Sequence, residues 1–324
     1  MRNLEVRIRR MPATAGDFEV VPGEVPRLTN GGILCRARWL AVDPFTCVPD
    51  GAPRSPTGPQ PGDVVPALGV CEVLESRHDV FAVGQYVVVE CGMREMCVSD
   101  GRHVCALHPG QSPASTALGL LGPSGMAAYF GLLDLAKLRI GESVLVSAAA
   151  NVAGAMAGQV ARIKGARAVG IGSSREKCDW ATRHARFSAC VDHHAKNLSS
   201  RLRQIAPRGF DVYFDNAGGE LLEVVLSGRH VASGGRVVLN SVRNDDPSDL
   251  LRRAGYAPGE INVLRISAAH FEHRRGEFLK DAIHWYGADR LVCREDVADG
   301  LENAPAQLIK AMRGENFGRP LIRL

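Results

Sequence analysis

The pattern of hydrophobic and polar positions divides the chain into a β-rich first part and a longer part in which strands alternate with helices. Apolar and polar residues alternate over 4–9 and 32–42, as in strands that are buried on one face. Further short apolar runs separated by turns cover 64–74, 85–91, 96–98 and 102–107. Proline and glycine dominate 48–62, which predicts a loop. We therefore expect a compact, barrel-like β domain.

From residue 115 onward, apolar residues recur at spacings of three and four, and this predicts helices interrupted at Gly122-Pro123. Strands are then predicted at 143–147, 168–171, 189–192, 210–215, 235–240 and 263–267. Helices are predicted up to Lys164 and over 176–186, 198–205, 220–226, 278–286 and 306–312, with a polar loop at 241–258. This alternation predicts a parallel, doubly wound sheet. The final strand, 320–323, is expected to return to the β domain.

The segment 141–174 has the order strand, tight turn, helix, strand that places a dinucleotide pyrophosphate at a helix N-terminus. Its glycine fingerprint is incomplete, because the three key positions are Ala149, Asn151 and Gly154. An ordinary tight turn that binds no nucleotide is the alternative. The second strand ends at Gly172 without an acidic residue, so nothing there suits an unmodified ribose diol. Ser173, Ser174 and Lys177 would instead suit a 2′-phosphate, although Lys177 could also be a solvated lysine.

Composition narrows the possible classes of protein. The net charge is +4 and the chain has no Lys/Arg block, which argues against a nucleic-acid partner. The chain also has no run of 18 apolar residues, so no membrane span is predicted. The start of the chain lacks the apolar core of a signal peptide, so we expect a cytoplasmic protein. Nine scattered cysteines include no C-x-x-C pair, and the spacing of Cys91, Cys97 and Cys105 is poor for a zinc lobe. We expect reduced thiols and no metal.

The chain resembles the zinc-independent medium-chain dehydrogenases/reductases, in the branch of the prostaglandin reductases and the alkenal or enone double-bond reductases. The stretches that carry the resemblance are LESRHDVFAVGQYV (74–87), MAAYFGLLDLAKLRIGESVLVSAAA (126–150), GQVARIKGARAVGI (158–171), FDVYFDNAGGE (210–220), REDVADGLENAPAQL (294–308) and GENFGRPLIRL (314–324). The resemblance implies an α/β fold with a GroES-like β-barrel substrate domain (1–112 and 290–324) around a Rossmann NADP-binding domain (113–289). It also implies a homodimer and a small-molecule substrate.

The resemblance implies NADPH as the cofactor, with Lys177 in the place of the family's lysine and His193 in the place of a tyrosine. It further implies contacts from Ala149, Asn151, Val152, Gly154, Ser173, Ser174, Asn216 and Asn316. Asn216 and Asn316 could alternatively be turn or cap residues. Asn151 stands where the family has glycine; asparagine can adopt the left-handed backbone of such a turn, but its side chain would point at the phosphates.

The activity that the resemblance implies is reduction of a C=C bond conjugated to a carbonyl, by hydride transfer to the β-carbon without a metal. The phenolic groups expected near the substrate are missing, and no general acid can be assigned. Phe45, Tyr129 and Ser241 are candidates for lining the cleft, although Tyr129 could instead pack in the core. Two alternatives remain: a non-redox scaffold (a cyclase, an isomerase or a binding protein) that retains nucleotide weakly or structurally, and an RNA- or partner-binding relative.

Overall fold

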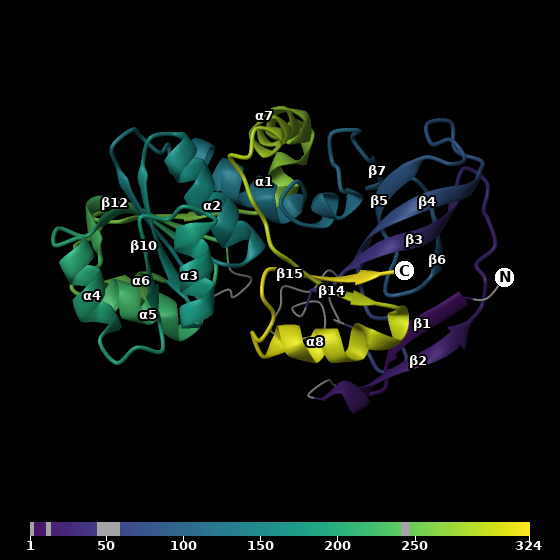
Figure 1. Cartoon of the computed structure of the whole chain (residues 1–324), viewed down its shortest axis with the longest axis horizontal. Helices are drawn as coiled ribbons and strands as arrows, with labels where there is room; N and C mark the ends of the chain where they lie inside the picture. Colours follow the sequence, from purple (N-terminus) through teal and green to yellow (C-terminus); the bar gives the residue numbers. More distant parts are fainter. Residues whose placement is uncertain (1–2, 11–13, 44–58, 241–246) are drawn as a thin grey trace. The chain divides into compact units, whose positions relative to one another are not determined.

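The computed structural model describes residues 3–10, 14–43, 59–240 and 247–324 (Figure 1). The chain forms two compact units: unit 1 comprises residues 1–119 and 295–324, and unit 2 comprises residues 120–294. The boundaries of unit 1, at residues 119 and 295, lie a few residues after the expected boundaries at 112 and 290. Ala117 and Leu118 are buried against the core of unit 1, whereas Val292 exchanges two hydrogen bonds with the side chain of Gln159 in unit 2.

Unit 1 consists mainly of antiparallel strands around an apolar core. Its larger sheet has the order β14-β15-β3-β4-β5-β7, β6 also pairs with β3, and β1 and β2 form a separate pair. Figure 1 shows the C-terminal strand β15 beside β3, from which it is distant in sequence. The strands are β1 (Asn3–Ile8), β2 (Phe18–Gly23), β3 (Ile33–Ala41), β4 (Leu68–Ser76), β5 (Tyr86–Glu90), β6 (Met96–Ser99), β7 (Cys105–Ala106), β14 (Glu295–Asp299) and β15 (Arg319–Arg323), with helix α8 at Ala304–Met312. The expected β-rich domain is confirmed.

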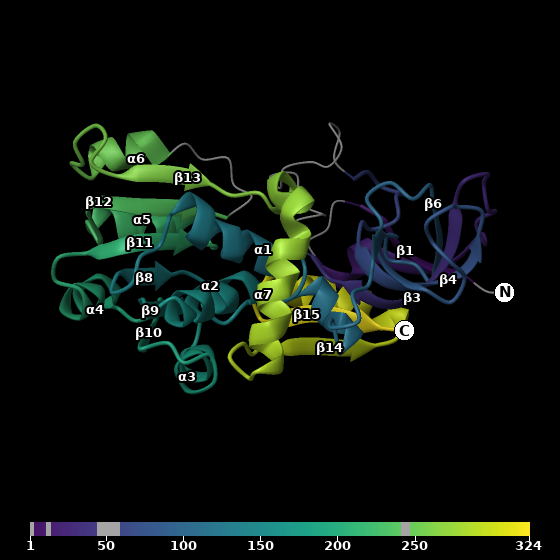
Figure 2. The same cartoon turned by 90° about the horizontal axis from the view of Figure 1, so that it is seen from above.

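Unit 2 contains a six-stranded parallel sheet in the order β10-β9-β8-β11-β12-β13, which Figure 2 shows from above. Numbered along the chain, this is the Rossmann order 3-2-1-4-5-6. The strands are β8 (Ser143–Val146), β9 (Arg167–Gly172), β10 (Ala189–Asp192), β11 (Phe210–Asp215), β12 (Val231–Leu239) and β13 (Asn262–Arg265). The predicted doubly wound sheet is therefore confirmed, and the reversal of strand order falls between β8 and β11.

Helices cover both faces of this sheet, and each face has its own apolar core. One core contains residues of α1, α2 and α7, and the other contains residues of α4, α5 and α6. The helices are α1 (Pro123–Phe130), α2 (Val152–Ile163), α3 (Arg175–Arg183), α4 (Leu198–Ile205), α5 (Gly219–Ser227), α6 (Pro247–Arg253) and α7 (Arg275–Gly287). In the described part of the chain, no helix is both long and apolar enough to cross a membrane.

Helix α6 corrects the prediction of a loop at 241–258, of which residues 241–246 lie outside the described residues. Leu250 and Leu251 pack against the core beside α5, and Asp249 pairs with Arg252 and Arg253 one turn later. The polar composition of the segment concealed this helix, because only two apolar side chains are enough to anchor two turns to an existing core.

Candidate functional site

The carboxyl ends of β8 and β11 flank the point where the strand order reverses, which is the usual ligand site of an open parallel sheet. The turn after β8 is very tight. Ala148 has a left-handed backbone (φ 49°), and a Cβ on Gly154 would lie 2.3 Å from the carbonyl oxygen of Ala148. The methyl group of Ala149 is fully buried over β9, where a Cβ on Gly170 would lie 2.7 Å from it. Small residues are thus required here for backbone packing.

Asn151 is the N-cap of α2, with an extended backbone (φ −88°, ψ 174°). Asn151 does not use the left-handed conformation that asparagine can adopt, because Ala148 supplies the positive φ of this turn. The Oδ1 of Asn151 accepts a hydrogen bond from the Gly154 amide at 3.1 Å, as N-cap side chains do. The carboxamide oxygen of Asn151 therefore accepts the hydrogen bond of one N-terminal amide of the helix, and this amide would otherwise face an anion.

Three carboxamides link the ends of neighbouring strands to this helix. Asn240, directly after β12, donates to Oδ1 of Asn216 at 2.7 Å, and Asn216, directly after β11, donates to Oδ1 of Asn151 at 2.7 Å. The sequence predicted Asn151 and Asn216 as separate cofactor contacts, and the part of Asn240 was not predicted. Their connection could not be read from the sequence, since it depends on the order of the strands in the sheet.

Asp215 organises the turn beneath Asn216. It is fully buried and accepts hydrogen bonds from the hydroxyls of Tyr213 (2.7 Å) and Ser147 (3.0 Å) and from the Gly218 amide (3.0 Å). Ser147 in turn accepts from the Asn216 amide at 2.7 Å. Burial and the adjacent carboxylate raise the pKa of Tyr213, so its hydroxyl remains a donor. Asp215, which was not predicted from the sequence, positions this turn; its place at the end of an apolar strand was the available signal.

A second group of polar side chains lies at the end of β9. The Nζ of Lys177 donates to the Ser173 hydroxyl at 3.0 Å, and the Ser174 hydroxyl caps α3 by accepting from the Lys177 amide at 3.2 Å. The His193 amide donates to the Gly172 carbonyl at 2.9 Å, which brings its ring to the same edge. Burial first, and then the charge of His194, lower the pKa of His193, although the carboxylate of Asp192 opposes this shift. Two hydroxyls, an ammonium and an imidazole suit a phosphate.

The remaining candidates do not join these groups. Tyr129 is 4% exposed, packs against Phe130, Phe278 and Trp285, and donates its hydroxyl to Asp281 at 2.8 Å. Burial, and then Asp281, raise its pKa. These contacts favour the core-packing alternative. Phe45 and Ser241 lie outside the described residues.

Asn316 belongs to unit 1, where its amide donates to the Gly318 carbonyl at 2.9 Å. This bond is the turn role that was weighed as the alternative to a cofactor contact.

The residues of unit 2 fit an anionic dinucleotide. The amides of Val152 and Ala153, in the first turn of α2, have no hydrogen-bond acceptor among the described residues. Buried Ala149 and Gly154 allow close approach of the backbone, and the group at the end of β9 offers hydroxyl and ammonium donors. Asn151 is the one feature that opposes the fit, because it occupies the third amide.

Comparison with known protein families and structures gives full-length similarities. Residues 3–107 match the model for the N-terminal domain of oxidoreductase, and residues 153–292 match the model for zinc-binding dehydrogenase. The chain is 34% identical over 325 residues to prostaglandin reductase 1 of Bos taurus, covering 96% of this chain and 94% of that protein. It is 33% identical over 320 residues to the NADPH-dependent curcumin reductase of Escherichia coli K12, covering 95% and 92%.

A solved structure, that of CurA from Vibrio vulnificus in complex with NADPH, superposes with a TM-score of 0.88. It is 29% identical and covers 99% of this chain and 98% of its own. Similarity of this extent in both sequence and fold includes both units of the chain.

Proposed function

Because this chain belongs to the medium-chain dehydrogenase/reductase superfamily, in the branch of the prostaglandin and curcumin reductases, we propose that it is an NADPH-dependent double-bond reductase. Its substrate is a small molecule with a C=C bond conjugated to a carbonyl group. The observation that carries this proposal is the Ser173, Ser174 and Lys177 group at the end of β9, where an NAD-binding site would have a carboxylate. The full-length similarity to NADPH-dependent relatives supports the same conclusion.

In this proposal three groups of residues in unit 2 bind different parts of the cofactor. The amides of Val152 and Ala153 hold the pyrophosphate at the N-terminus of α2, and Lys177 with the two serines and His193 holds the 2′-phosphate. Asn216 holds the turn beside the nicotinamide ribose, and Asp215 keeps that turn in place through the Gly218 amide. When bound, NADPH supplies the hydride that reduces the β-carbon of the substrate.

From the resemblance and the composition we further propose that the protein is a cytoplasmic homodimer. We also propose that the β domain (1–112 and 290–324) binds the substrate and that Asn316 contacts the cofactor.

Ligand-dependent thermal stability tests the cofactor. A ligand that binds the native state raises the melting temperature, so NADPH should raise it more than NADH at equal concentration. Absence of a shift with either nucleotide would contradict the proposal. Oxidation of NADPH, followed by absorbance with a panel of conjugated enals and enones, tests the reaction.

The alternative, a non-redox scaffold that retains the nucleotide, is motivated by the hydrogen bond from the Gly154 amide to Asn151. NADPH binding without oxidation by any member of the panel would favour this alternative.

A further inference from the structure

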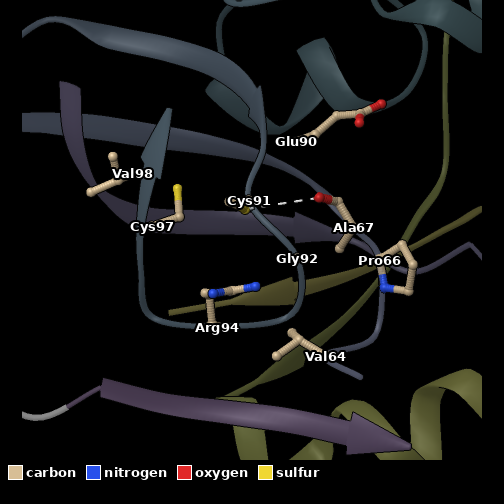
Figure 3. A pocket seen from close by; sticks show the side chains of 9 residues that line it. All are labelled: Val64, Pro66, Ala67, Glu90, Cys91, Gly92, Arg94, Cys97 and Val98. Carbon is tan, nitrogen blue, oxygen red and sulfur yellow. Dashed lines mark hydrogen bonds between the residues drawn. The ribbon is translucent and has the colours of Figure 1, made fainter. Parts of the chain in front are cut away.

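Three cysteines of unit 1 bring their sulfur atoms together in the β domain. The Sγ atoms of Cys71, Cys91 and Cys97 all lie within 4.8 Å of one another, and all three side chains are buried. Cys71 belongs to β4, Cys97 belongs to β6, and Cys91 directly follows β5. Figure 3 shows Cys91 and Cys97 on neighbouring segments of the wall of one pocket. The spacing along the sequence did not reveal this cluster, because its members come from separate strands.

The backbone leaves room for these sulfur atoms. A Cβ on Gly69 of β4 would lie 2.5 Å from Sγ of Cys91 and 3.1 Å from Sγ of Cys71. Any side chain at this position would therefore push the two sulfurs away. The pocket beside them has a volume of about 320 Å³ and is lined by Val64, Pro66, Ala67, Glu90, Cys91, Gly92, Arg94, Cys97 and Val98.

Arg94 places a positive charge at the same pocket (Figure 3). Its Nη1 lies 3.6 Å from Oε1 of Glu5, which is longer than a hydrogen bond, and Arg7 holds the other oxygen of Glu5 at 2.7 Å. Its Nε is buried without a hydrogen-bond partner in the described part of the chain. Buried donors are normally satisfied, so this guanidinium has capacity for a further negative group.

We propose that Cys71, Cys91 and Cys97 form a binding site for a thiophilic d10 metal ion, with Zn²⁺ as the ion that fits best. Thiolates bind zinc at about 2.3 Å, which places three such sulfurs at about 3.8 Å from one another. The present separations of up to 4.8 Å require only a small contraction. The group contains only sulfur donors, and such sets select soft metals over magnesium or calcium.

Arg94 balances the charge of the proposed zinc–thiolate group. Three S–H bonds break, three Zn–S bonds form, and three protons leave to solvent. The product carries one net negative charge, which the guanidinium of Arg94 offsets. The pocket beside Cys91 and Cys97 leaves room for water as a fourth ligand. The ion would crosslink β4, β6 and the segment after β5, and so stabilise the β domain. This inference does not depend on the proposed reductase activity.

The test uses the intact, fully reduced protein after removal of metal with a chelator under anaerobic conditions. Titration with Cd²⁺ should produce an ultraviolet thiolate-to-cadmium charge-transfer band that saturates at one equivalent, and Zn²⁺ should compete for the same site. X-ray absorption of the zinc-loaded protein should show sulfur neighbours at about 2.3 Å. Zinc should also raise the melting temperature by several degrees. Absence of the band in folded, reduced protein would overturn the proposal.

Matched variants locate the site. Cys97→Ser should weaken Cd²⁺ binding by roughly 100-fold or more, whereas Cys105→Ser, in β7 of the same unit, should bind as the wild type does. The reverse result would overturn the assignment. If Cys97→Ser does not fold, the wild type alone decides: X-ray absorption of the zinc-loaded protein should give three sulfur neighbours per zinc ion. Fewer than three sulfur neighbours would contradict the site.

Discussion

Asn216 donates a hydrogen bond from Nδ2 to Oδ1 of Asn151 at 2.7 Å, across the point where the strand order of the parallel sheet reverses. The same Oδ1 accepts from the Gly154 amide, so a single oxygen caps α2 and ties it to the turn after β11. This oxygen lies where the first turn of α2 would face an anion. The cap stabilises the helix but occupies one of the amides available to a pyrophosphate.

Asn151→Asp tests the effect of charge at this position. The carboxylate can keep both hydrogen bonds and is favourable at a helix N-terminus, so the melting temperature should stay within about 2 °C or rise. Its negative charge would repel the pyrophosphate, and we expect the Kd for NADPH to increase roughly tenfold, or about 1.4 kcal/mol. Isothermal titration measures the Kd. Asn197→Asp, at the N-cap of α4, is the matched control and should bind NADPH normally. Unchanged affinity in Asn151→Asp would place the pyrophosphate elsewhere.

Lys177→Ala tests the 2′-phosphate site. A hydrogen bond to a charged group contributes about 1.5–3 kcal/mol, so the Kd for NADPH should rise by roughly tenfold or more, while the Kd for NADH should hardly change. The informative readout is the ratio of the two constants. Lys196→Ala, an exposed lysine near the same strand ends, is the control. Equal loss of affinity for both nucleotides would indicate a structural role for Lys177 instead.

Tyr129→Phe distinguishes core packing from contact with the substrate. Removal of the hydroxyl leaves Asp281 without this donor, so the free energy of unfolding should fall by about 1 kcal/mol. The value of kcat/KM, once a substrate is found, should stay within about twofold of the wild type, because the hydroxyl is committed to Asp281. Denaturant unfolding and steady-state kinetics measure the two quantities. A large loss of kcat at unchanged stability would restore Tyr129 as a catalytic candidate.

Burial of His230 should lower the free energy of unfolding at acid pH. Its side chain is buried beside the Ser199 hydroxyl, and burial, followed by the charge of Arg203, lowers its pKa to about 4. The unfolded chain, with a histidine pKa of about 6.5, therefore binds more protons between these values. The free energy of unfolding should fall as the pH drops from about 6.5 towards 4, with a contribution of up to about 1.4 kcal/mol per pH unit.

The control for this acid sensitivity replaces the ring. His230→Gln should flatten the pH dependence of the melting temperature in this range, whereas His273→Gln, at an exposed position, should leave it unchanged. An identical pH profile in the wild type and His230→Gln would assign the acid sensitivity to other groups.

Local patterns were sufficient to predict most elements of unit 2. Strands β10 and β11 and helix α4 were predicted to the residue. The two strands are short apolar runs, as in a buried parallel sheet, and the apolar residues of α4 recur at helical spacing. The absence of an acid after β9 and the serines with Lys177 were also readable, because these residues are neighbours in sequence. Helix α6 was missed, since its stability depends on two leucines and a core formed by other segments.

Relationships between distant residues were decided only by tertiary structure. The carboxamides of Asn240, Asn216 and Asn151 meet because β12, β11 and β8 are adjacent in the sheet. The turn after β8 needs one left-handed residue, and this residue is Ala148 and not Asn151. Cys71, Cys91 and Cys97 converge for the same reason, because they lie on β4, directly after β5 and on β6, which belong to one sheet. Periodicity along a chain reports which face of an element is buried, but strand order and register determine which side chains meet there.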